Sequence, residues 1–167
     1  MSKQILHPPV GKKLKLKDFD PRFCDGLDKE PTKLETILLQ ERLQELQTML
    51  FADKSQALLI VLQAMDAGGK DGTIKHVFTG VNPQGVKVTG FKQPTAEELD
   101  HDFLWRIHHH TPEKGYIGIF NRSHYEDVLV VRVNNIVPKA VWKKRYDHIN
   151  NFERLLADNG TRIVKFY

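Results

Sequence analysis

A segment in the first half of the chain combines three glycines, a lysine and two carboxylates in the sequence AMDAGGKDGT, residues 64–73. Gly68, Gly69 and Gly72 have no Cβ, so backbone amides in this loop can turn inward and donate to a bound ligand. Lys70 adds a mobile positive charge. A glycine-rich turn that leads into the first amides of a helix typically binds phosphate. The segment therefore predicts an anion site.

The segment departs from the common phosphate-loop pattern G-x-x-x-x-G-K-[ST]. Ala64 stands in place of the first glycine and Asp71 in place of the hydroxyl residue, so that Thr73 is the nearest substitute. Asp66 also lies inside the loop, where its carboxylate would repel a bound phosphate unless a metal ion or a proton lay between them. The presence of Asp66 is the most informative departure from the common phosphate-loop pattern. A plain glycine-rich turn with an exposed lysine is the alternative.

A second set of polar side chains occurs in the sequence NRSHYED, residues 121–127. It directly follows GYIGIF, residues 115–120, a short apolar segment that predicts a strand. Ligands of open α/β sheets bind at the carboxyl ends of the strands. We therefore expect residues 121–127, and the loop GFKQP at residues 90–94, to lie near the glycine-rich loop.

The elements that must position these residues are predicted by their apolar patterns. The segment LLIVL, residues 58–62, has no polar alternation, which is typical of a strand buried on both faces of a parallel sheet. Three further strands are expected, at residues 85–89, 115–120 and 161–167.

Helical patterns separate these strands. Apolar residues at three- and four-residue spacing predict an amphipathic helix from Pro31 to about Ala52. Thr95 and Glu98 have the spacing of a capping box that opens a helix running through Ile107. Other helices are expected at residues 73–80, 140–158 and 123–133, where the sequence VLVVRV would also permit a strand. This alternation predicts an α/β fold with a mainly parallel sheet and helices on both faces.

The first thirty residues predict a mostly irregular N-terminal arm, and residues 31–167 a single core domain. The alternating sequence KKLKLK, residues 12–17, indicates either a short edge strand kept soluble by lysine or an arm that contacts a polyanion.

The composition is that of an ordinary globular protein, with 167 residues of which 40% are hydrophobic and 28% charged. A net charge of +4 favours acidic partners. No apolar segment approaches the roughly 20 residues that cross a bilayer, so we expect no membrane partner and a cytoplasmic location. Cys24 is the only cysteine, which excludes an intramolecular disulfide. Residues 108–110 are three histidines, but adjacent helical side chains point about 100° apart and cannot all bind one metal.

Several long segments closely resemble polyphosphate kinase family 2: LQAMDAGGKDGTIKHV, VNPQGVKVTGFKQPTAEELDHDFLWRIH, IGIFNRSHYEDVLVVRV and the final GTRIVKFY. The resemblance covers nearly the whole chain. It implies a three-layer α/β/α P-loop kinase fold similar to thymidylate kinase. It also implies magnesium-dependent transfer of a terminal phosphoryl group between inorganic polyphosphate and a nucleotide.

Within that family, the sequence NRSHYEDV resembles the groups that phosphorylate AMP, or both AMP and ADP. The group confined to ADP typically has an aspartate where Asn121 stands. The implied partners are polyphosphate and adenine or other purine nucleotides, and not nucleic acid. A homo-oligomer is also expected, because the helix at residues 31–52 has apolar surface that could pair with another copy.

The resemblance implies roles for individual residues. Asp66 and Asp127 are candidate magnesium ligands, Lys70 and Arg122 would hold phosphate, and these four are the expected catalytic residues. Phosphate-binding residues are expected at Ala67, Gly68, Gly69, Asp71, Gly72, Thr73, Lys75 and Arg132, and nucleotide contacts at Phe91, Asn121 and Glu126. Solvated helix charges are the alternative for Lys75 and Arg132, and Glu126 could form only a local cap or pair.

The chain departs from the family in its length, because members continue past KFY into helices that include an arginine-bearing lid. We therefore expect weak or no turnover from this polypeptide, since lid closure excludes water and completes a positive site. Two other functions remain open. One is an ATP-dependent nucleoside or nucleotide kinase, which would not be expected to have Asp66 in the loop, and the other is a phosphate-binding module without catalysis.

Overall fold

The computed structural model describes residues 11, 14–15, 17, 19–20, 22–24 and 26–167. The chain forms two compact units, Met1–Leu39 and Gln40–Tyr167. Lys12, Lys13 and Leu16 of the predicted edge strand lie outside the described residues, while Leu14 and Lys15 are in no strand. The predicted arm at residues 1–30 stays a prediction.

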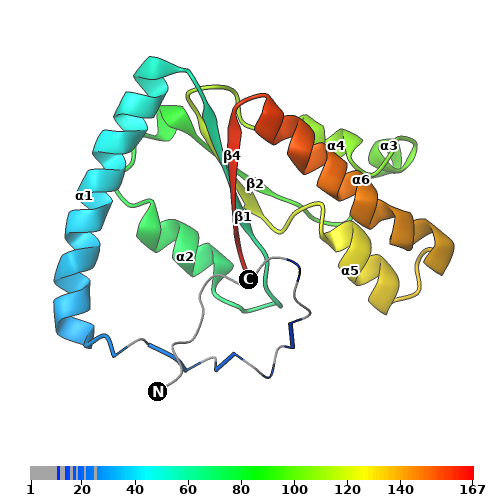
Figure 1. Cartoon of the computed structure of the whole chain (residues 1–167), viewed down its shortest axis with the longest axis horizontal. Helices are drawn as coiled ribbons and strands as arrows, with labels where there is room; N and C mark the ends of the chain where they lie inside the picture. Colours follow the sequence, from blue (N-terminus) through cyan, green and yellow to red (C-terminus); the bar gives the residue numbers. More distant parts are fainter. Residues whose placement is uncertain (1–10, 12–13, 16, 18, 21, 25) are drawn as a thin grey trace. The chain divides into compact units, whose positions relative to one another are not determined.

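The second unit contains a four-stranded sheet in the order β2-β3-β1-β4. Figure 1 shows this sheet between helices on its two sides. All neighbouring strands are parallel, and Leu62 at the end of β1 is in register with Asn121 of β3 and Phe166 of β4. The strands are β1 (Ala57–Leu62), β2 (Val86–Gly90), β3 (Ile117–Asn121) and β4 (Thr161–Phe166). All four predicted strands and their parallel arrangement are confirmed.

The two faces of the sheet have separate hydrophobic cores. On one face, Leu59 and Val61 of β1 pack with Phe120, with Ile107 of α4 (Trp105–His108) and with Phe152 of α6 (Lys139–Asp158). On the other face, Leu62 packs with Ile74 of α2 (Lys70–Val77) and with Leu50 of α1 (Lys29–Asp53). The continuous apolar sequence of β1 thus follows from its burial on both sides, and the three-layer prediction is confirmed.

The predicted helix from Thr95 through Ile107 is wrong in its length. Thr95 and Glu98 do form a capping box, but α3 (Ala96–Leu99) is followed by a turn before α4 begins. The Asp102 carboxylate accepts a hydrogen bond from the Leu104 amide at 2.9 Å. This side chain competes for the backbone amides and interrupts the helix.

The helical alternative for residues 123–133 is confirmed, with α5 spanning Glu126–Val133. The helix begins after Ser123, whose hydroxyl accepts from the Tyr125 amide at 3.2 Å. No helix in the described part of the chain is both long enough and apolar enough to span a bilayer.

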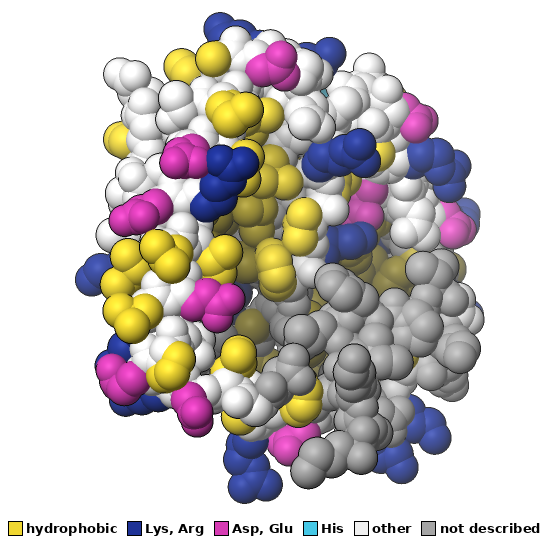
Figure 2. All heavy atoms as spheres, turned by 60° about the vertical axis from the view of Figure 1, so that its left-hand side comes forward, with side chains coloured by type: hydrophobic (Ala, Val, Ile, Leu, Met, Phe, Trp, Pro, Cys, Tyr) yellow, Lys and Arg dark blue, Asp and Glu magenta, His cyan; other side chains and the backbone are white. Residues whose placement is uncertain are grey.

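The exposed side of α1 is rich in hydrophobic residues, as Figure 2 shows for the face on which this helix lies. In the second unit, Leu46 and Met49 are exposed, whereas Gln47 is buried. Pairing of this surface with another copy stays a prediction.

Candidate active site

The glycine-rich loop connects β1 to α2 through two backbone positions in the left-handed region. Ala67 has a φ of 60° and Gly69 a φ of 82°. A left-handed conformation costs a non-glycine residue about 1–2 kcal/mol, so Ala67 is held in a strained conformation. Gly69 is the N-cap of α2, which places Asp71, Gly72 and Thr73 in the first turn of the helix. The helix begins three residues earlier than predicted, so its free amides face the loop.

Close backbone packing explains the middle of the loop. A Cβ on Gly68 would lie 2.7 Å from the Cβ of Ala64 and 2.9 Å from the carbonyl oxygen of Met65. The Gly68 amide donates to the same carbonyl at 3.0 Å. The loop is therefore compact, and a side chain at position 68 would force it open.

Lys70 folds back over this loop. Its Nζ donates to the carbonyl oxygens of Ala64 at 3.0 Å and Met65 at 2.9 Å. These contacts hold the ammonium group against the backbone of its own loop.

Asp66 forms an ion pair with Arg122, which directly follows β3. The Asp66 side chain is 87% exposed and that of Arg122 is 39% exposed. Arg122 has a φ of 64°, and its amide donates to the Leu62 carbonyl at 3.0 Å. The predicted contact between the glycine-rich loop and the polar segment after β3 therefore forms, with Arg122 offsetting the Asp66 charge.

A second contact joins the same two segments, because the Asn121 side-chain amide donates to the Asp71 carboxylate. The structure thus brings together Asp66, Lys70, Asp71, Asn121 and Arg122 at the carboxyl edge of the sheet. Their charges compensate one another within the protein.

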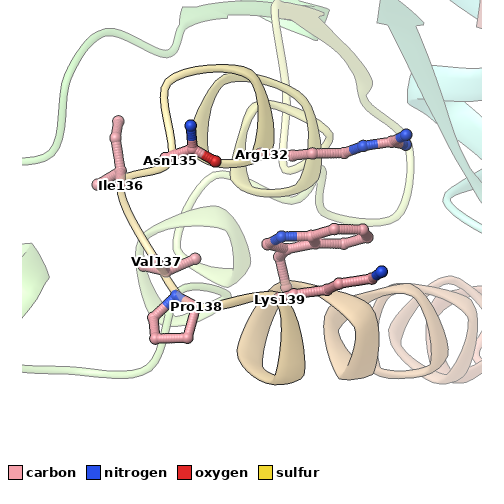
Figure 3. Close-up of a pocket in the computed structure, with 7 residues that line it drawn as sticks. Arg132, Asn135, Ile136, Val137, Pro138 and Lys139 are labelled. Atoms are coloured by element: carbon pink, nitrogen blue, oxygen red, sulfur yellow. The ribbon is translucent and has the colours of Figure 1, made fainter.

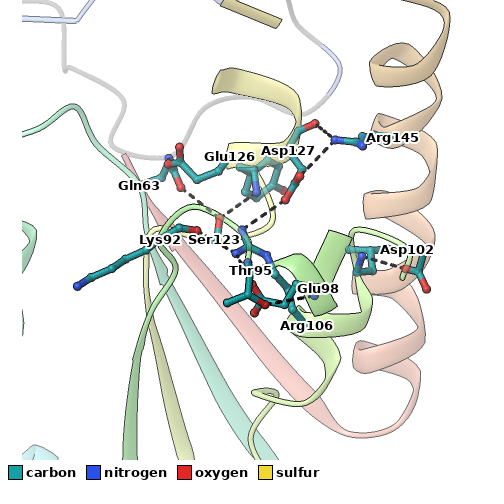
Figure 4. A network of polar contacts seen from close by, with 12 residues as sticks. Gln63, Lys92, Thr95, Glu98, Asp102, Arg106, Ser123, Glu126, Asp127 and Arg145 are labelled. Carbon is teal, nitrogen blue, oxygen red and sulfur yellow. Dashed lines mark hydrogen bonds and ion pairs between the residues drawn. The ribbon is translucent and has the colours of Figure 1, made fainter. Parts of the chain in front are cut away.

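Asp127 lies in a different environment, shown in Figure 4. Its side chain forms ion pairs with Arg145 at 3.2 Å and Arg106 at 3.8 Å. Burial raises the pKa of the Asp127 carboxyl, and the two arginines oppose this shift. In the described part of the chain, no hydrogen bond or ion pair joins Asp127 to Asp66.

Four polar residues near the site had not been predicted to bind phosphate, nucleotide or metal: Gln63, Arg106, Ser123 and Arg145. The Ser123 hydroxyl donates to the Gln63 side-chain oxygen at 3.2 Å, and the Gln63 amide donates to Glu126 at 2.5 Å (Figure 4). Arg106 is 6% exposed and donates to the Lys92 carbonyl at 2.9 Å. Gln63 directly follows the buried strand segment, which is the one sequence signal that could have identified it.

Phe91 and Glu126, two predicted nucleotide contacts, line a common cavity of about 480 Å³ together with Arg106, Arg122 and Asp127. Phe91 is 5% exposed, and the Arg106 guanidinium lies 5.5 Å from its ring centroid. Asn121, the third predicted nucleotide contact, instead pairs with Asp71. The cavity combines an aromatic wall with both signs of charge.

Two predicted phosphate-binding residues lie outside this cluster. The Arg132 guanidinium lies 5.1 Å from the ring centroid of Trp142, on the wall of a cavity of about 560 Å³ between α5 and α6 (Figure 3). No residue of the glycine-rich loop lines that cavity. Lys75 is exposed on α2. Phosphate binding by these two residues stays a prediction.

Magnesium at this site would be held by few protein ligands. Among the described residues, no group of three or more His, Cys, Asp or Glu side chains could hold a metal ion. Mg²⁺ is usually bound by one or two carboxylates, waters and substrate phosphates. Asp66, exposed inside a phosphate loop, fits this donor set.

The chain is similar over most of its length to proteins of one known family. A family model described as Polyphosphate kinase 2 (PPK2) matches residues 26–167. An AMP/ADP-polyphosphate phosphotransferase of Meiothermus ruber is 55% identical over 93% of this chain and 59% of its own length. An ADP-polyphosphate phosphotransferase of Rhodopseudomonas palustris is 48% identical over 93% of the chain and 63% of its own length.

The chain is also similar to a solved structure. The crystal structure of Polyphosphate Kinase 2 from Arthrobacter aurescens TC1 matches with a TM-score of 0.87 and 44% identity, covering 93% of this chain and 57% of that one. The chain therefore spans about three fifths of the length of these three relatives.

Proposed function

The chain belongs to the polyphosphate kinase 2 family, and from this membership we propose that it transfers a terminal phosphoryl group between inorganic polyphosphate and AMP or ADP. The observation that supports the proposal is the contact between Asp66 of the glycine-rich loop and Arg122 after β3. In this contact a carboxylate of the glycine-rich loop and a guanidinium meet at the carboxyl edge of the sheet.

Phosphoryl transfer depends on positioning and on neutralisation of charge more than on covalent chemistry by the protein. The amides of residues 68–70 and the Lys70 ammonium group would hold phosphate oxygens. The planar guanidinium of Arg122 can donate two parallel hydrogen bonds to a phosphate. Lys75 and Arg132 would extend the cationic surface for a polymer.

We propose magnesium as the cofactor, with Asp66 as its main protein ligand. When bound, the ion would neutralise charge on the phosphates. Asp66 would then no longer need Arg122 as its counter-ion, which leaves the guanidinium free to contact phosphate. Asp127 stays a proposed second ligand, and its two arginine partners make it the weaker candidate.

The cavity lined by Phe91 and Glu126 is the proposed site for the nucleotide. It adjoins the phosphate-binding residues, because Arg122 also lines it. A homo-oligomeric assembly and a location in the cytoplasm stay proposals as well.

A donor and acceptor panel tests this function. The chain is incubated with magnesium and either polyphosphate or ATP as sole donor. ADP formation from AMP is followed by chromatography with both donors, and ATP formation from ADP with polyphosphate alone. Polyphosphate-dependent product that is lost in Lys70→Ala and kept in the surface control Lys114→Ala supports the proposal. Product formed only with ATP would indicate the alternative kinase, and polyphosphate binding without product would indicate a binding module.

A further inference from the structure

The turn between β3 and α5 has to hold Arg122 in an unfavourable backbone conformation. A residue other than glycine with a positive φ persists only where its surroundings determine it from several sides. On one side the turn is tied to the end of β1, where the Ser123 hydroxyl donates to Gln63. This leaves the question of what holds the other side.

Glu153 of α6 provides that second attachment. Its Oε1 accepts from the Tyr125 hydroxyl at 2.7 Å and lies 3.1 Å from Nε2 of His124. Its Oε2 accepts from Nζ of Lys165, on β4, at 2.7 Å. One carboxylate therefore joins the turn after β3 to both α6 and β4.

The environment keeps this carboxylate charged. Its side chain is only 13% exposed, and burial alone would raise its pKa. Hydrogen bonds from His124, Lys165 and Tyr125 outweigh burial and lower the pKa of Glu153 to about 2. An ionised carboxylate only accepts hydrogen bonds, so His124 Nε2 is the donor in its contact with Glu153.

We propose that Glu153 is a positioning residue for phosphate binding and transfer. By holding His124 and Tyr125, it fixes the turn that begins at Arg122 and so directs the Arg122 guanidinium toward the glycine-rich loop. Glu153 has no hydrogen bond or ion pair with Arg122 or with the loop among the described residues, so it acts only through the turn. The inference rests on the proposed function where it concerns transfer, and on the geometry alone where it concerns Arg122.

The main test compares Glu153→Gln with a matched surface control, Glu113→Gln. The substitution at position 153 keeps the side chain's shape but replaces one acceptor oxygen with a donor and removes the charge. Circular dichroism and urea unfolding first establish conditions in which both variants are fully folded. The Nε–Hε NMR signal of Arg122, assigned by its loss in Arg122→Lys, then reports the guanidinium directly. We expect it to shift or broaden in Glu153→Gln and to be unchanged in Glu113→Gln.

A double-mutant cycle tests whether Glu153 acts through Arg122. With Arg122 present, Glu153→Gln should weaken tripolyphosphate binding about tenfold, as small displacements of positioned groups do. In the Arg122→Gln background the same change should have no further effect, because the group that it positions is gone. A merely structural role would weaken binding equally in both backgrounds.

The outcomes separate this inference from the proposed function. An unchanged Arg122 signal in folded Glu153→Gln, or equal losses in both backgrounds, overturns the positioning role even if the chain transfers phosphoryl groups. A shifted signal with a non-additive loss of binding supports it even if no transfer is observed, in which case the proposed function alone fails.

Discussion

Arg122 and Asp66 are 56 positions apart in the sequence, and their side chains form an ion pair across the candidate active site. Each of these two side chains is therefore paired with the other before any substrate binds. Both side chains remain accessible to solvent, so the pair is weak enough to exchange for stronger ligands. Two consequences of this arrangement can be measured at Asp66.

Asp66→Asn should abolish magnesium-dependent transfer while sparing polymer binding. Without magnesium, the variant should bind tripolyphosphate about three- to tenfold more tightly, because it removes a like charge and releases Arg122. Chromatography of the nucleotide products measures the transfer, and calorimetric titration with tripolyphosphate in the absence of magnesium measures the binding, with Asp100→Asn as an exposed control for both. Full transfer activity in Asp66→Asn would remove this carboxylate from the mechanism.

Lys70→Ala should weaken tripolyphosphate binding at least tenfold, since a charge-assisted contact to phosphate is lost. The fold should remain intact, because among the described residues the Nζ has hydrogen bonds only to two carbonyl oxygens of its own loop. Fluorescence or calorimetric titration measures the binding, and circular dichroism the fold. Unchanged binding would contradict the assignment of this loop as a phosphate cradle.

Two glycines of the loop should respond to alanine in opposite ways. Gly69→Ala introduces a side chain at a φ of 82° and should destabilise the protein by about 1–2 kcal/mol. Gly72→Ala lies within α2, where a Cβ meets no atom within 4 Å, and should stabilise it by about 0.5–1 kcal/mol. Urea unfolding of both variants gives the comparison. Equal effects would show that the backbone at position 69 is not left-handed in solution.

Glu153 should make stability depend on pH in the acid range. Its pKa falls from 4.5 to about 2 on folding, so it stabilises the native state above pH 4.5 and loses this contribution as the pH falls toward 2. The difference amounts to ~3 kcal/mol. Urea unfolding of the unmodified chain and Glu153→Gln between pH 2 and 7 should show a stability gap that closes at the acid end. A gap independent of pH would contradict the depressed pKa.

The pKa of Asp127 is shifted in the opposite direction to that of Glu153. Its pKa is raised by burial, so folding favours its protonated form and its contribution becomes less favourable as the pH rises through the folded pKa. Asp127→Asn therefore serves as the control for the Glu153 series, because it should not remove the acid-range loss.

Local patterns predicted most elements of the fold. The continuous apolar sequence at residues 58–62 identified the central strand, and Thr95 with Glu98 identified a helix start that the structure confirms. The extension of that helix to Ile107 was wrong because Asp102 bonds the Leu104 amide, a short-range competition that apolar spacing does not reveal.

The site was predicted less completely, because it depends on which strands are neighbours. Parallel strands were expected, but Arg122 lies beside Asp66 because β3 is the neighbour of β1 in the sheet. Arg106 and Arg145 have the sequence appearance of solvated helix charges, and their pairing with Asp127 depends on tertiary packing. Glu153 was missed for the same reason, since its three partners come from residues 124, 125 and 165.

The position of β1 between β3 and β4 has a consequence for folding kinetics. Leu58 pairs with Ile117 on one side and with Arg162 on the other, so both neighbours of this strand are distant in sequence. During synthesis, β1 leaves the ribosome well before either partner, so one of its edges is unpaired until β3 has been made and the other until β4 has been made. Pairing over such separations is slow, which makes the assembly of the central strand a late event and the nascent chain prone to aggregation until then.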